Sequence, residues 1–183
     1  MWFRNRYKRY WGGDLVISHD IANSNSLNLK EFFTLYKKYP LELPLALNIK
    51  ADGLQIPLKK LLEEYKITNY FVFDMSVPDT LTYVELNFNI FTRQSELEPN
   101  PCLYDKAQGV WLDEFYTHWI DKKTIKFHLE QGKKVCIVSP ELHQRNFLKE
   151  WEEYKQIDLE LNPKENLMLC TDYIQKAKEF FNV

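Results

Sequence analysis

The sequence predicts an α/β fold in which helices cover a parallel sheet, and three observations lead to this prediction. Short apolar runs of strand length recur along the chain. The segments between them place apolar residues at helical spacing. The runs are apolar over their whole length, which is typical of parallel strands covered on both faces.

Seven apolar runs are the predicted strands. In chain order they are 15–18, 45–49, 70–73, 88–91, 109–112, 134–138 and 167–170. Helical spacing is most regular at 29–39 and 56–65, and further helices are predicted at 122–131, 141–155 and 173–181. Prolines interrupt 77–86 and 95–106, so these two connections are expected to be irregular.

Successive runs lie about 20 to 30 residues apart, so about seven βα units fill residues 1–183 as a single domain. The usual barrel closes with eight such units. We therefore expect a TIM-like (βα) barrel that is incomplete by one unit. A doubly wound open sheet is the alternative, but none of the 5 glycines forms a GxGxxG turn or a P-loop.

Composition and charge exclude several classes of protein. The chain is 45% apolar and 27% charged, the balance of a folded globular protein. A formal charge of -2 predicts no nucleic-acid partner, although residues 1–12 form a basic and aromatic segment. No apolar stretch has the length of a membrane span, and no signal core follows the start. Together with three widely spaced cysteines, this predicts a cytoplasmic protein.

Polar residues follow every predicted strand, and in a barrel these strand ends converge on one face. They are His19 and Asp20; Asn48 and Lys50; Asp74 and Ser76; Arg93, Gln94 and Glu96; Asp113 and Glu114; Ser139 and Glu141; and Thr171 and Asp172. His19 beside a carboxylate is a candidate general acid or base. Lys50 offers a point charge and Arg93 a planar fork, which together suit a phosphorylated ligand.

Each of these residues also has a structural interpretation. Ser139, Thr171 and Asp172 are typical helix N-caps. Lys50 and Arg93 can instead pair with an acid, the candidates being Asp74, Asp113 and Glu96. The same three acids, if they lie on neighbouring strand ends, would suit glycoside chemistry by paired carboxylates. His118, His128 and His143 lack metal-ligand spacing and receive no predicted role.

The segment 13–20, reading GDLVISHD, and the later segment 45–50, reading LALNIK, resemble two strands of the glycerophosphodiester phosphodiesterase family. Phosphatidylinositol-specific phospholipase C is a relative of that family. Its "DG-x-x-V-x-x-HD" strand carries one of two catalytic histidines, and its "E-I-K" strand carries a metal-binding glutamate and a substrate-binding lysine. The resemblance covers about residues 13 to 180, because the later runs fit the remaining strands in order.

The resemblance implies catalysis by His19 and substrate binding by Lys50. Arg93, Asp74 and Asp113 are further predicted substrate-binding residues because they lie at the ends of predicted strands. The resemblance also implies a divalent cation, Mg²⁺ or Ca²⁺, for which Asp20 and Asn48 are the candidate ligands. The chain departs from the family because Asn48 stands where the glutamate is expected. Residues 5–9 read NRYKR where an acidic pair is expected, and no "H-R-G" strand precedes residue 13.

Two functions follow from the matches and the departures. The first is hydrolysis of a glycerol- or sugar-linked phosphodiester. The second is a truncated or degenerate barrel that binds a phosphorylated ligand or a partner without catalysis. A missing strand would expose sheet edges and favour self-association, unless residues 1–12 supply a substitute strand.

Overall fold

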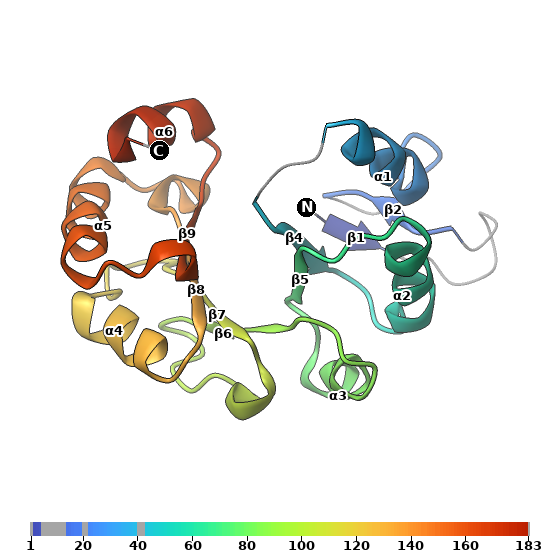
Figure 1. Cartoon of the computed structure of the whole chain (residues 1–183), viewed down its shortest axis with the longest axis horizontal. Coiled ribbons are helices and arrows are strands. Elements are labelled where there is room, and N and C mark those ends of the chain that lie inside the picture. The colour runs from blue at the N-terminus through green and yellow to red at the C-terminus, as the bar shows by residue number, and fades with distance from the viewer. Residues whose placement is uncertain (1, 5–13, 20–21, 40–42, 183) are drawn as a thin grey trace. The chain divides into compact units, whose positions relative to one another are not determined.

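The computed structural model describes residues 2–4, 14–19, 22–39 and 43–182 (Figure 1). The chain divides into two compact units, residues 1–90 and 91–183, and each is described by itself. The described residues form six α-helices and two sheets, so the predicted α/β class is confirmed. The described strands form no closed sheet, and the barrel stays a prediction.

The first unit contains a five-stranded mixed sheet in the order β3-β2-β1-β4-β5. The strands are β1 (Trp2–Arg4), β2 (Val16–Ile17), β3 (Leu27–Asn28), β4 (Leu45–Ile49) and β5 (Tyr70–Phe73). Its helices are α1 (Leu29–Lys38), α2 (Gln55–Glu64) and α3 (Val77–Glu85). The helices predicted at 29–39 and 56–65 are therefore present, and 77–86 is more regular than its proline suggested.

The strand predicted at 15–18 does not join the sheet in the expected direction. It corresponds to β2, which runs antiparallel to β1, whereas β1 is parallel to β4. The connection from Arg4 to Val16 is shorter than the dozen or more residues that a parallel crossover needs. The described part of the basic N-terminal segment, Trp2–Arg4, thus forms a parallel strand beside β4.

Local sequence explains where the first-unit helices begin. Asn28 caps α1 because its Oδ1 accepts a hydrogen bond from Lys30 N at 2.9 Å. α1 buries Leu29 and Phe33. Ser76 is the N-cap of α3. Pro78 lies in the first turn of this helix, where the fixed φ of proline matches the helical backbone. The first-turn position explains why proline does not disrupt this helix.

The second unit contains a four-stranded, entirely parallel sheet in the order β6-β7-β8-β9. The strands are β6 (Phe91–Gln94), β7 (Gly109–Leu112), β8 (Lys134–Val138) and β9 (Leu167–Cys170). The helices are α4 (Lys122–Glu130), α5 (Leu148–Leu161) and α6 (Ile174–Phe181), with short 3-10 turns η1 (Tyr104–Lys106), η2 (Pro140–His143) and η3 (Lys164–Asn166). Side chains from β7, β8, α4 and α5 form its core.

Two predicted elements of this region are shifted along the chain. The run 88–91 supplies an isolated parallel bridge between Ile90 and Val72, and β6 begins only at Phe91. The helix predicted at 141–155 begins at Leu148, because η2 ends at Gln144 in a left-handed conformation with φ of 59°. Among the described residues, no helix combines the length and the apolar character needed to cross a membrane.

Candidate functional site

At the carboxyl ends of β4 and β5, three predicted site residues lie together. Asn48 Nδ2 donates a hydrogen bond to Asp74 Oδ2 at 2.9 Å, and Lys50 Nζ lies 3.2 Å from the same oxygen. The Asp74 side chain is only 12% exposed. The structural interpretation of Lys50 as the partner of Asp74 is therefore confirmed.

The described residues around Asn48 do not fit a Mg²⁺ or Ca²⁺ ion. Such ions need several oxygen ligands, about six to eight for calcium, and favour carboxylates. Here the carboxylate of Asp74 already receives an ammonium and an amide N–H. Asn48 Oδ1 is buried and accepts no hydrogen bond within the described residues, but it is a single neutral oxygen. Asp20, the other candidate ligand, lies outside the described residues.

His19 leaves the first-unit sheet in a different direction from Lys50. Phe3 pairs with both Ile17 and Ile49, and β2 runs antiparallel to β4. Ile17 and Ile49 therefore lie level with each other in the sheet, on strands that run in opposite directions. His19 follows Ile17 toward one end of the strands, and Lys50 follows Ile49 toward the opposite end. The expectation that all strand ends converge therefore fails for His19, because it assumed that the strand at 15–18 was parallel. His19 is exposed, and its catalytic role stays a prediction.

In the second unit, the carboxyl ends of β7 and β8 bring Asp113 and His143 together. His143 Nε2 lies 2.6 Å from Asp113 Oδ1, although the two residues are 30 positions apart. Asp113 is 6% exposed, and its backbone N–H donates to Gln94 O at 3.0 Å. The His143 side chain is 23% exposed and therefore reaches solvent. A buried carboxylate that orients an accessible imidazole is an arrangement suited to acid–base chemistry.

Arg93 lies next to this pair. Its guanidinium carbon is 5.8 Å from the centre of the Phe115 ring, and that ring is 4.7 Å from the His143 ring. Arg93 Nε also donates to Glu98, an acid that the sequence interpretation did not consider. Arg93, Phe115, His143 and Asp113 thus form one continuous set of contacts at the carboxyl ends of β6, β7 and β8.

The remaining strand-end acids of this unit are engaged with the backbone or with hydroxyl groups. Glu96 Oε1 accepts hydrogen bonds from Tyr116 N at 2.6 Å and Thr117 N at 3.3 Å. Burial raises the pKa of Glu96, but the backbone donors outweigh burial and leave the pKa below its ordinary value. Glu141 accepts hydrogen bonds from the hydroxyls of Ser139 and Thr171. The predicted helix caps are wrong: Ser139 precedes η2 without a capping side-chain hydrogen bond, and the N-cap of α6 is Tyr173 and not Thr171 or Asp172.

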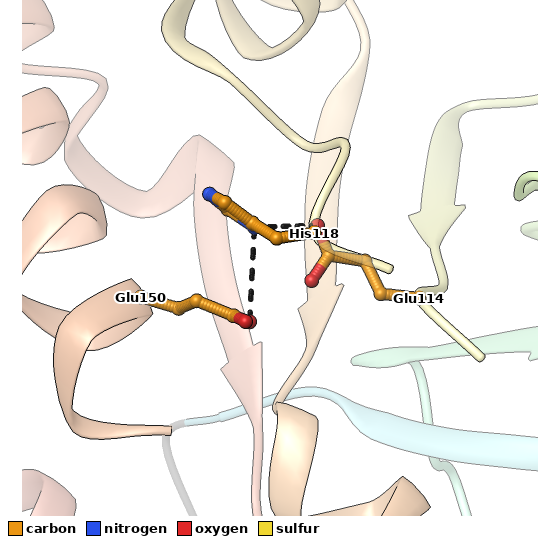
Figure 2. A group of neighbouring side chains, drawn as sticks. All are labelled: Glu114, His118 and Glu150. Carbon is orange, nitrogen blue, oxygen red and sulfur yellow. Dashed lines mark hydrogen bonds and ion pairs between the residues drawn. The ribbon is translucent and has the colours of Figure 1, made fainter. Parts of the chain in front are cut away.

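A third cluster consists of Glu114, His118 and Glu150. Figure 2 shows both carboxylates turned toward the His118 ring, Glu114 and His118 from the loop after β7 and Glu150 from α5. His118 Nδ1 lies 2.9 Å from Glu114 Oε1 and 3.7 Å from Glu150 Oε2. One ligand atom from each residue lies within 4.8 Å of the others, so the cluster has the donor set to hold a metal ion.

Sequence reasoning named Glu114 and Asp113 as strand-end residues but missed their histidine partners. His143 was placed inside a helix, whereas it ends the η2 turn after β8. His118 lies in the loop between β7 and α4, where no ligand spacing marks it. Only their positions in the sequence could have identified these two histidines, because each follows an apolar run by a few residues and so lies near the end of a predicted strand.

The fold is similar to that of a crystal structure from Galdieria sulphuraria, an inferred glycerophosphodiester phosphodiesterase. The likeness has a TM-score of 0.72 and covers 100% of this chain and 84% of that chain. At 16% sequence identity the likeness shows the fold alone. No protein-family model and no curated protein matches the sequence.

Proposed function

We propose that the chain is a glycerophosphodiester phosphodiesterase-like hydrolase that cleaves a glycerol- or sugar-linked phosphodiester. The observation that carries this proposal is the 2.6 Å contact between His143 Nε2 and the buried Asp113 carboxylate at the carboxyl ends of parallel strands. The sequence resemblance and the fold likeness supply the substrate class. In this proposal His143 is the general acid or base and Asp113 orients it.

The reaction needs a proton acceptor, a proton donor and a cation near the phosphate. Asp113 accepts the proton on His143 Nε2, so Nδ1 is the atom that takes a proton from the attacking water. Water adds to phosphorus, the bond from phosphorus to the alcohol oxygen breaks, and the protonated imidazole returns its proton to the departing alcohol. A phosphomonoester and an alcohol are the products. Arg93 would bind the phosphate oxygens.

The resemblance assigns further roles in the first unit. His19 as an acid or base, and Lys50 and Asp74 as substrate-binding residues, stay proposals that rest on the family motifs. Asp113 was predicted to contact substrate, and its contact with His143 favours an orienting role instead. No step is derived through Mg²⁺ or Ca²⁺, because the described residues around Asn48 do not fit either ion.

The test is hydrolysis of bis(p-nitrophenyl) phosphate by the full chain, with His143→Gln and Asp113→Asn as variants. Loss of a general acid or base costs about 10²–10⁴-fold in rate, and we expect the His143 variant to fall in that range. Asp105→Asn is the matched control, since Asp105 is an exposed acid of the η1 turn. Turnover that survives His143→Gln unchanged would refute the assignment.

Binding of a phosphorylated ligand without catalysis is the second candidate. It is favoured by Asn48, which stands where the family motif has a glutamate and whose amide points to Asp74. Calorimetric titration with glycerol 3-phosphate distinguishes the two functions. Binding with no turnover of any phosphodiester would favour this candidate over hydrolysis.

Three further expectations from the sequence stay predictions. They are a cytoplasmic location, the absence of a nucleic-acid partner, and self-association through sheet edges. Size-exclusion chromatography with light scattering tests the third, since a monomer at micromolar concentration would contradict it.

A further inference from the structure

The cluster of Glu114, His118 and Glu150 contains none of the residues given a role in hydrolysis, and its side chains come from the loop after β7 and from α5. Glu114 is completely buried and Glu150 is 8% exposed. Two carboxylates in such a position repel each other, and both are hydrogen-bond acceptors when ionised. Their close approach therefore needs positive charge beside them, and Arg145 supplies one charge against the two carboxylates.

One oxygen of the cluster has no donor. Glu150 Oε2 is buried and accepts no hydrogen bond from the described residues, although it points at His118 Nδ1 from 3.7 Å.

The other atoms of the cluster are held by a second set of contacts. His118 Nε2 lies 3.1 Å from Glu153 Oε2, and in the neutral tautomer with its proton on Nε2 the Nδ1 lone pair faces the carboxylates. Glu114 Oε1 also accepts hydrogen bonds from Trp119 N at 2.9 Å and Ile120 N at 2.7 Å. Arg145 Nη1 donates to Glu114 Oε2 at 3.2 Å, and Arg145 Nη2 donates to Glu150 Oε1. A histidine that donates its second N–H to a carboxylate is a recurrent feature of metal sites.

Charge and spacing both favour a divalent transition metal. Three carboxylates against one guanidinium leave two negative charges when the imidazole is neutral. Zinc–ligand bonds of about 2.0–2.1 Å place tetrahedral ligand atoms about 3.3–3.4 Å apart. The two contacts of His118 Nδ1, at 2.9 and 3.7 Å, bracket that separation. An imidazole with two carboxylates suits zinc better than magnesium or calcium.

We propose that Glu114 Oε1, His118 Nδ1 and Glu150 Oε2 bind one Zn²⁺ ion, which joins the loop after β7 to the first turn of α5. The ion supplies positive charge that Arg145 alone does not provide. Three protein ligands leave a fourth position for water. Glu153 acts as a positioning residue, because it holds the His118 ring in the tautomer that can coordinate.

The experiment measures zinc bound to the full chain after treatment with a chelator and dialysis against Zn²⁺. We expect one zinc per chain, determined by elemental analysis, and a higher melting temperature with zinc than without it. Glu150→Gln keeps the shape of the side chain and is expected to lose the ion. Glu152→Gln is the matched control, because Glu152 is an exposed acid two residues along the same helix.

A second variant keeps the proposal testable if Glu150→Gln does not fold. Glu153→Ala removes only the partner of His118 Nε2, and it is expected to weaken zinc binding about 10–100-fold. A chain that binds no zinc would overturn the proposal and leave a shared proton as the explanation of the cluster. Zinc bound equally well by the parent chain and both cluster variants would also overturn it, since the ion would then lie elsewhere.

Discussion

Acidification is expected to destabilise the second unit through one buried histidine. His128 is 1% exposed, and each of its ring nitrogens has one partner. Nε2 lies 2.7 Å from Gln94 Oε1, and Nδ1 lies 2.9 Å from the Tyr104 hydroxyl. The amide of Gln94 is oriented by its donation to Pro99 O. The neutral imidazole therefore donates from Nε2 and accepts at Nδ1, and protonation would disturb this arrangement.

The magnitude follows from the shift in pKa between the unfolded and folded chain. Burial lowers the pKa of His128 from 6.5 to about 4. As pH falls through 6.5 the unfolded chain takes up a proton that the folded chain does not, so stability is complete above pH 6.5 and decreases below it. At 1.36 kcal/mol per pKa unit, the loss is about 2 kcal/mol at pH 5 and about 3 kcal/mol at pH 4.

The assay is urea denaturation of the full chain at a series of pH values, followed by tryptophan fluorescence. Three of the five tryptophans lie in the second unit. His128→Gln retains a donor and an acceptor but does not titrate. Other acid-sensitive groups affect both proteins equally, so the difference between their free energies of unfolding isolates His128. Parallel pH profiles for the two proteins would refute this explanation.

Three other substitutions have defined structural costs. Gly109→Ala would place a methyl group against the ring of Phe91, its partner in the parallel register, and is expected to cost about 1–3 kcal/mol in a urea titration. Asp121→Ala removes the N-cap of α4 and is expected to lower the free energy of unfolding by about 1 kcal/mol in the same urea titration. Loss of helical circular dichroism at an unchanged urea concentration would contradict this. Trp151→Phe deletes the indole N–H that lies 2.7 Å from Ser139 Oγ in the core; we expect a loss of about 2 kcal/mol, and an unchanged urea midpoint would contradict it.

The sequence predicted β7, β8 and β9 of the second unit well, because these runs are apolar over nearly their whole length, whereas β6 begins three residues later than the run predicted for it. It could not predict the direction of the run at 15–18, since an apolar run of that length reads the same in a parallel and an antiparallel pair. The short connection between β1 and β2 requires an antiparallel pair, but β1 has only three residues and was not recognised as a strand in the sequence.

The candidate sites were less predictable for a geometric reason. Asp113 and His143 meet only because η2 reverses the chain after β8 and delays α5. Glu150 meets His118 because α5 packs with its first turn toward the loop after β7. Neither pairing has a local spacing signal, whereas Lys50 and Asp74 follow adjacent parallel strands and could be expected to meet.

Asp74 holds Lys50 and Asn48 from an unusual backbone position. Its φ of 68° lies in the left-handed region, which only glycine, asparagine and aspartate adopt readily. The backbone therefore restricts which residues this position can accept during evolution. Glutamate could preserve the charge but would suffer strain, whereas asparagine and glycine fit the conformation and abolish the charge. A lineage that lost the Lys50 contact would thus be expected to pass through asparagine or glycine at this position, with little effect on the fold.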